Sequence, residues 1–150
     1  MSDATNALGQ AKYQVRFDWG AAGAASVGQD ADATVWVSQV LEVAGPAGSV
    51  SGRLEDAAEL GAWALAQQQQ LGGRFRIAVV AAGAARADGS LRFAVEDLLA
   101  AGAIIEAIAD VGIDHQSPEA AAAAAAYTGL RTATRHLISA SETSRESHGG

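Results

Sequence analysis

The sequence predicts one layered α/β domain with a largely parallel sheet. Segments with strand-like patterning alternate with longer segments whose apolar residues recur at helical spacing, and this alternation is typical of parallel sheets covered by helices. Glycine and proline residues separate many of these segments. The chain has 150 residues, 49 % of them hydrophobic, which suffices for the core of one domain but not of two.

Three segments are predicted to be strands. Residues 13–18 alternate apolar and polar side chains, the period-2 pattern of a half-buried strand. Residues 33–41 are rich in apolar side chains, which favours a place at the centre of the sheet. Residues 74–82 end in an apolar run that we expect to be buried. We expect loops at residues 45–49, which contain glycine, proline and serine, and at residues 83–90, which contain an Asp-Gly turn signal.

Helices are predicted between the strands and after them. A short helix is expected in the Ala/Gly-rich run that ends near Gly28. Residues 53–71 carry apolar side chains at helical spacing, and the Gly-Gly pair that follows them is expected to end that helix. A third helix is expected over residues 93–110, ended by Gly112.

Ser117 is predicted to begin a fourth helix. Serine suits the N-cap, Pro118 the first helical position, and Glu119 the first turn. Seven alanines at residues 120–126 continue the helix, because alanine has the highest helix propensity. Gly129 is expected to divide it from a last helix.

The expected domain spans residues 12–140, between a flexible leader (1–11) and a flexible polar tail (141–150). The first ten residues lack the basic-then-apolar pattern of a secretory signal. The longest apolar run, near residues 77–85, is far shorter than the roughly 20 residues that cross a bilayer. The sequence therefore predicts a soluble, cytoplasmic protein without a membrane partner.

The composition of the chain excludes several kinds of binding partner and metal site. The formal net charge is −7 and lysine and arginine form no cluster, which argues against nucleic-acid binding as the main activity. Without cysteine the chain has no disulfide or thiolate site, and its 3 histidines lack zinc-ligand spacing. Because alanine and glycine outnumber large apolar residues, each core residue buries little area. We expect either modest stability or an oligomer interface, with a homodimer as the default.

Three stretches carry a resemblance to a known family. They read YQVRFDWGAAGA at 13–24, DGSLRFAVEDLLAAGAII at 88–105 and GIDHQSPEAAAAAAAYTGLRTATRHL at 112–137. In this order they resemble the 2-phosphosulfolactate phosphatase family, in particular its actinobacterial-type members. The resemblance implies a three-layer α/β/α fold and a magnesium-dependent phosphoric monoester hydrolase. Its substrate would be a small anionic phosphate monoester such as 2-phosphosulfolactate.

The resemblance also marks acidic and basic positions. Glu96 and Asp97 would hold Mg²⁺ and, with Asp18, supply the catalytic carboxylates. The residues alone leave an alternative open, because acids in the first turn of a helix also stabilise its dipole. Arg16 and Asp18 share one face of the first strand. They either bind phosphate and metal or form a charge pair on a solvated face.

The candidate substrate contacts are Gly83, Arg86 and Ser38. Gly83 follows the third strand, at the edge where parallel sheets bind ligands, so its loop can bring backbone N–H groups to a phosphate, with Arg86 nearby. Ser38 stands where members of the family carry an aspartate, and Ala84 and Ala85 stand where they carry Glu-Arg. These departures leave a second function open: a relative that no longer hydrolyses phosphate esters and serves as a binding or assembly module, self-associating through its Ala-rich helices.

Overall fold

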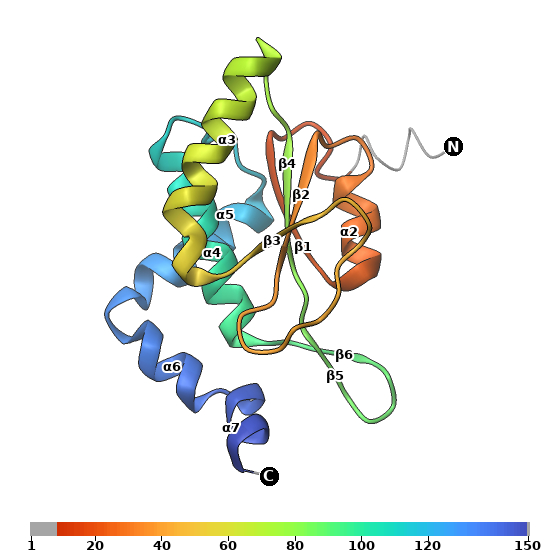
Figure 1. Cartoon of the computed structure of the whole chain (residues 1–150), viewed down its shortest axis with the longest axis vertical. Coiled ribbons are helices and arrows are strands. Elements are labelled where there is room, and N and C mark those ends of the chain that lie inside the picture. Colours follow the sequence, from red (N-terminus) through yellow and green to blue (C-terminus); the bar gives the residue numbers. More distant parts are fainter. Residues whose placement is uncertain (1–8, 150) are drawn as a thin grey trace.

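The fold is built on a parallel sheet of four strands, in a computed structural model that describes residues 9–149 (Figure 1). The strand order is β1 (Val15–Trp19), β4 (Ile77–Ala81), β2 (Ala33–Val37) and β3 (Val50–Gly52). Every neighbouring pair in this sheet runs parallel. The predicted α/β class with a largely parallel sheet is therefore confirmed.

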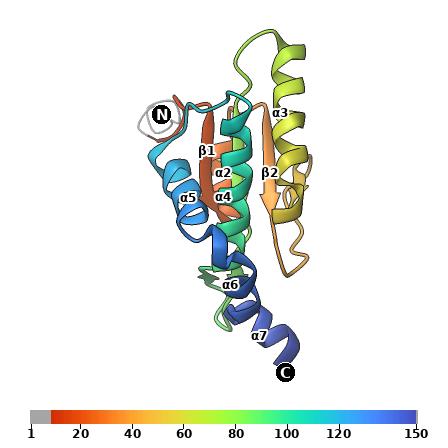
Figure 2. The same ribbon diagram turned by 90° about the vertical axis from the view of Figure 1, so that its left-hand side faces the viewer.

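Helices cover both faces of this sheet (Figures 1 and 2). On one face lie α3 (Ala57–Leu71), α4 (Val95–Asp110) and α5 (Pro118–Gly129), and on the other lies α2 (Gly20–Gly28). Strand alternation divides the core in the same way, since successive side chains point to opposite faces. Val15 and Phe17 pack toward α4 and α5, whereas Trp36 and Val80 pack toward α2.

The predicted start of α5 is confirmed in detail. The Oγ atom of Ser117 accepts a hydrogen bond from the N–H of Ala120 at 3.0 Å, and Pro118 is the first helical residue. Ser117 also donates a hydrogen bond from Oγ to Oε1 of Gln10 at 2.7 Å. The cap therefore joins α5 to the segment that precedes β1.

The packing of α4 on α5 depends on one glycine. A Cβ atom added at Gly102 would lie 2.2 Å from the carbonyl oxygen of Ala123. The alanines of α5 that face inward, Ala120, Ala123 and Ala124, are buried in this contact region. The close backbone approach that small side chains permit is thus used within the chain.

The substitution Gly102→Ala is expected to destabilise the fold by about 2–3 kcal/mol. The added methyl group would meet a helix carbonyl, which cannot rotate away as a side chain can. Urea unfolding measures the loss, with Gly129→Ala as the matched control, because nothing lies within 4 Å of a Cβ at Gly129. Equal stability of the two variants would contradict the account of the interface.

Several predicted boundaries are wrong. The strand predicted over residues 33–41 ends at Val37, because the side chain of Ser38 bonds to the loop that follows. Strand β3 was not predicted, since three residues that include an exposed serine and a glycine are too few to form a pattern. The loop predicted over residues 83–90 instead begins an antiparallel hairpin of β5 (Ala84–Ala85) and β6 (Leu91–Arg92).

Two predicted helices begin or divide differently from the expectation. The segment 53–71 opens with a 3-10 turn, η1 (Leu54–Asp56), before α3 begins. After α5 comes a second 3-10 turn, η2 (Arg131–Ala133), and then α6 (Thr134–Ala140). The helix predicted to end near residue 140 is therefore confirmed, although it is not the last helix.

The tail predicted to be flexible forms a further helix, α7 (Glu142–Gly149). Its first turn is capped, because Oγ of Ser141 accepts a hydrogen bond from the N–H of Ser144 at 3.2 Å. The carbonyl of Ser141 also accepts from the N–H of Arg145 at 3.0 Å. Polar composition alone was therefore a misleading signal of fraying.

The expected leader falls partly outside the described residues, which begin at residue 9. The described Gln10 pairs with the outer edge of β1. Its Nε2 donates to the carbonyl of Phe17 at 2.8 Å, and its Oε1 accepts from the N–H of Phe17 at 2.9 Å. One side-chain amide thus takes the hydrogen bonds that a neighbouring strand would otherwise take.

None of the helices within residues 9–149 combines the length and the apolar character needed to cross a bilayer.

Candidate functional site

The carboxyl end of the parallel sheet brings several candidate residues together. At this end β1, β2 and β4 finish, α2 and α4 begin, and the β5–β6 hairpin leaves the sheet (Figure 1). Parallel sheets bind their ligands at this end, because the loops there meet helix N-termini.

Asp97 holds the ends of two strands. Its Oδ1 accepts the N–H of Gln39 at 2.8 Å and its Oδ2 accepts the N–H of Gly83 at 2.9 Å. Gln39 follows β2 and Gly83 follows β4, so one carboxylate bridges the two loops. The pKa of Asp97 is raised to about 7, mainly by burial and to a smaller extent by the neighbouring charge of Glu96, although the two backbone hydrogen bonds act in the opposite direction.

Glu96 is buried beside Asp97, with only 2 % of its surface exposed. Both acids lie in the first turn of α4, as the sequence predicts. Neither side chain lines the two cavities that open near this end of the sheet. The carboxylate of Asp97 therefore stabilises the strand ends, and neither acid contributes to the lining of these two cavities.

Mg²⁺ was expected on these acids. Within residues 9–149 no three His, Cys, Asp or Glu side chains lie close enough to hold a metal ion together. Asp18 does not join Glu96 and Asp97: its Oδ1 accepts the N–H of Trp19 at 2.7 Å, and its side chain packs against Gly23 of α2. Among residues 9–149, the three acids expected to act together therefore do not form one carboxylate cluster that faces the cavity.

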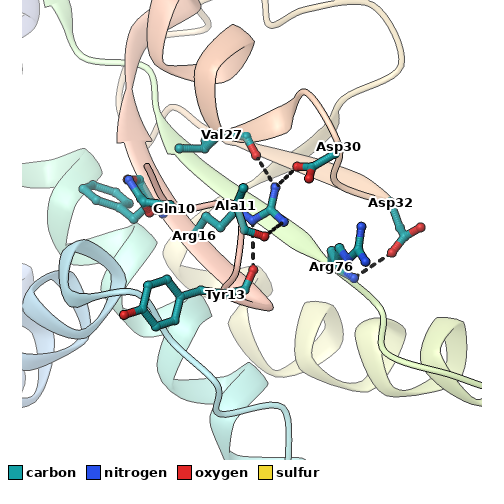
Figure 3. Close-up of polar contacts among 9 residues, drawn as sticks. Gln10, Ala11, Tyr13, Arg16, Val27, Asp30, Asp32 and Arg76 are labelled. Carbon is teal, nitrogen blue, oxygen red and sulfur yellow. Dashed lines mark hydrogen bonds and ion pairs between the residues drawn. The ribbon is translucent and has the colours of Figure 1, made fainter. Parts of the chain in front are cut away.

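Arg16 lies near the amino end of the sheet, beside the residues that precede β2 and β4 (Figure 3). It is 1 % exposed, and its guanidinium bonds to three carbonyls and one carboxylate. Nε donates to Tyr13 at 2.9 Å, Nη2 to Ala11 at 2.7 Å, and Nη1 to Val27 at 3.0 Å and to Asp30 at 2.5 Å. Arg16 therefore neither faces a phosphate site nor forms a charge pair on a solvated surface, the two alternatives that the sequence had predicted. Its guanidinium and these four acceptors are called the Arg16 clamp below.

The Arg16 clamp also changes the pKa of Asp30. The hydrogen bond from Arg16 lowers the pKa of Asp30 below its ordinary value. Asp30 lies just after α2, and Val27 lies in its last turn. Arg16 thereby fixes the end of α2 to β1.

The three expected substrate contacts serve the local backbone. Oγ of Ser38 donates to the carbonyl of Leu41 at 2.5 Å and shapes the turn after β2. The N–H of Gly83 is given to Asp97, so it does not point to a phosphate. Arg86 donates from Nη1 to the carbonyl of Leu91 at 2.7 Å, within its own exposed hairpin.

A cavity of about 630 Å³ opens at this end of the sheet, a volume typical of small-molecule sites. The start of α2, the residues that follow β4, the hairpin and α7 form its walls. Its lining includes Gly20, Ala21, Leu41, Gly83, Ala84, Ala85, Ser90, Arg92, Thr143 and Glu146. The walls are mostly small and apolar, and Arg92 supplies the positive charge.

Arg92 is the residue that sequence reasoning missed. Its Nη1 pairs with Glu146 and lies 3.4 Å from Oε2 of Glu142, and its Nη2 donates to Oγ1 of Thr143 at 2.9 Å. The hydrogen bond to Glu146 raises the pKa of Arg92 above its ordinary value. The Nε atom is buried, and no residue from 9 to 149 accepts its hydrogen bond. The available signal was a lone arginine between two large apolar residues after an Asp-Gly turn.

Comparison with known proteins adds no family. No protein-family model matches the chain, and no curated protein matches it either. The resemblance to phosphosulfolactate phosphatases therefore stays a prediction.

Proposed function

We propose that this protein is a binding module for a small anionic phosphate ester and that it does not hydrolyse its ligand. The phosphate would lie against Arg92 in the cavity at the carboxyl end of the sheet. One observation carries the proposal: Arg92 lines this cavity, whereas Glu96 and Asp97 do not.

Arg92 has the chemistry that a phosphate needs. A guanidinium presents a planar fork of N–H donors that matches phosphate oxygens, and its charge is permanent. Gly20 and Ala21 also line the cavity, and they begin α2. Trp19 provides no side-chain cap there, and the N-terminus of a helix attracts anions through its first N–H groups.

Hydrolysis has less support than binding. Phosphoryl transfer needs a positioned nucleophile and groups that stabilise charge on the phosphate. Each oxygen of Asp97 already accepts a backbone N–H, and these bonds hold the loops after β2 and β4. A catalytic role for Asp97 would require that the carboxylate leave the contacts that shape the site.

The test combines a binding measurement with a hydrolysis assay. Calorimetry with 2-phosphosulfolactate and with phenyl phosphate is expected to detect binding to the wild type. The variant Arg92→Met should bind at least about tenfold more weakly. The matched control is Arg86→Met, which lies in the same hairpin but not in the cavity lining. Its affinity should equal that of the wild type.

Phosphate release is measured in parallel with and without Mg²⁺. No turnover is expected under either condition. Metal-dependent release that disappears in Asp97→Ala would overturn the proposal in favour of a hydrolase. Absence of binding to either phosphate ester, or equal affinity of Arg92→Met and wild type, would refute the anion site.

Self-association remains a separate prediction. The inward alanines of α5 pack within the chain, while Ala121, Ala122 and Ala125 are exposed. Sedimentation equilibrium measures whether the expected homodimer forms.

A further inference from the structure

We infer that α7 is a built-in competitor for the anion site: its acidic side chains occupy Arg92, and a bound phosphate ester displaces them. This inference rests on the proposed function, because it concerns the regulation of the same site. It assigns a role to the C-terminal segment, for which the sequence predicted only a flexible tail.

The contacts of Arg92 resemble those of an anion-binding guanidinium with its anion in place. Glu146 and Glu142 present carboxylates to Nη1, and Thr143 presents a hydroxyl to Nη2. All three residues belong to the first turns of α7. Carboxylate and phosphate are the two anions whose geometry the guanidinium fork matches, so they compete for the same donors.

This internal arrangement leaves Arg92 incompletely satisfied. Its Nε is buried and finds no acceptor within the described residues. A buried donor without an acceptor is unfavourable, and such groups are rare in native proteins. A phosphate that replaces α7 can bind the guanidinium in the bidentate manner through Nε and one Nη atom, which would give Nε its acceptor. An external phosphate therefore has an advantage over the carboxylates of α7.

The attachment of α7 is also suited to release. The side chains of Glu142 and Glu146 are 77 % and 64 % exposed, and exposed ion pairs contribute little to stability. The segment Glu142–Gly149 contains no large apolar residue that could anchor it in the core, and the side chains that it does bury, Thr143 and Ser144, are small and polar.

The position of α7 at the end of the molecule also favours its release. A groove of about 1450 Å³ lies between residues of α6 and α7 and residues around Val40 and Leu54. In Figures 1 and 2, α6 and α7 extend away from the sheet beyond its carboxyl end. Movement of α7 therefore disturbs little of the main core.

The test uses the full chain and removes only the competing charges. In Glu142→Gln/Glu146→Gln, both carboxylates become neutral amides of the same shape. Calorimetry with phenyl phosphate and 2-phosphosulfolactate should show about fivefold tighter binding than in the wild type, as expected for the loss of two exposed competitors. The control Glu59→Gln/Glu119→Gln changes two exposed acids on α3 and α5 and should leave the affinity unchanged.

Limited proteolysis gives a second readout in the wild type. Arg145 lies in α7 and is exposed, so trypsin can cleave after it once the helix is released. Saturating phenyl phosphate is expected to accelerate this cleavage severalfold. The control double variant should respond as the wild type does.

The outcomes separate the two proposals. If the wild type binds phosphate esters but the Gln double variant binds no more tightly, or if the ligand leaves cleavage after Arg145 unchanged, the inference about α7 is overturned and the anion site stands. If neither wild type nor double variant binds, the proposed function fails, and the inference fails with it.

Discussion

Replacing Arg16 by methionine is expected to lower the free energy of unfolding by about 3–5 kcal/mol. Methionine keeps a long apolar stem but removes the guanidinium. The carbonyls of Ala11, Tyr13 and Val27 then lose their donor, and a buried acceptor without a donor is costly. The end of α2 would also lose its connection to β1.

Urea unfolding of Arg16→Met is compared with that of Asp30→Asn. The side chain of Asp30 is 45 % exposed, so loss of its charge should cost only about 0–1 kcal/mol. A loss for Asp30→Asn as large as that for Arg16→Met would show that the ion pair, and not the three carbonyl contacts, dominates the clamp.

The second large effect is a pH dependence that originates at Asp97. Its pKa is about 7 in the folded protein against an ordinary value of 3.8, so the folded protein holds a proton that the unfolded chain releases. The stability that this proton contributes is fully present below about pH 4 and is lost as the pH rises to about 7. The difference between the two values corresponds to a loss on the order of 4 kcal/mol.

The variant Asp97→Asn isolates this contribution. Asparagine cannot ionise, and it replaces one acceptor with an NH₂ group, which adds a penalty that does not depend on pH. The free energy of unfolding of the wild type minus that of Asp97→Asn should therefore fall steadily between pH 4 and pH 7. A difference that stays constant, or that rises with pH, would contradict a raised pKa at Asp97. Exposed acids whose pKa values are lowered, such as Asp88, affect both proteins equally and cancel.

The elements that could be predicted from the sequence were those whose residues form a pattern with their near neighbours in the chain. The alternation around Phe17 placed β1 correctly, although both of its faces are covered and not one, and the Ser-Pro-Glu signal at residue 117 located the start of α5. Both signals depend only on neighbours in sequence. Strand β3 lacked such a signal, because its three residues are too few to show a period.

The candidate site was harder to predict, because its partners are distant in sequence. Asp97 was correctly placed in the first turn of α4, but the two N–H groups that it accepts come from loops 58 and 14 residues away. Arg16 was expected to contact phosphate or to lie on a solvated face of β1, yet it is buried, and the acceptors that bury it lie up to 14 residues away in sequence. Arg92 was missed because its partners lie in a segment whose polar composition predicted fraying.

The amide of Gln10 has a consequence for association between molecules. An exposed strand edge is a template on which other chains add strands, and this is a common route to aggregation. Gln10 occupies the hydrogen-bonding groups of Phe17 at the centre of β1, so a second molecule cannot extend the sheet across that edge while the glutamine is in place. The opposite edge is β3, which has only three residues and ends in a glycine, and such an edge is a poor template. Neither edge of the four-stranded sheet is therefore suited to join the sheet of a second molecule.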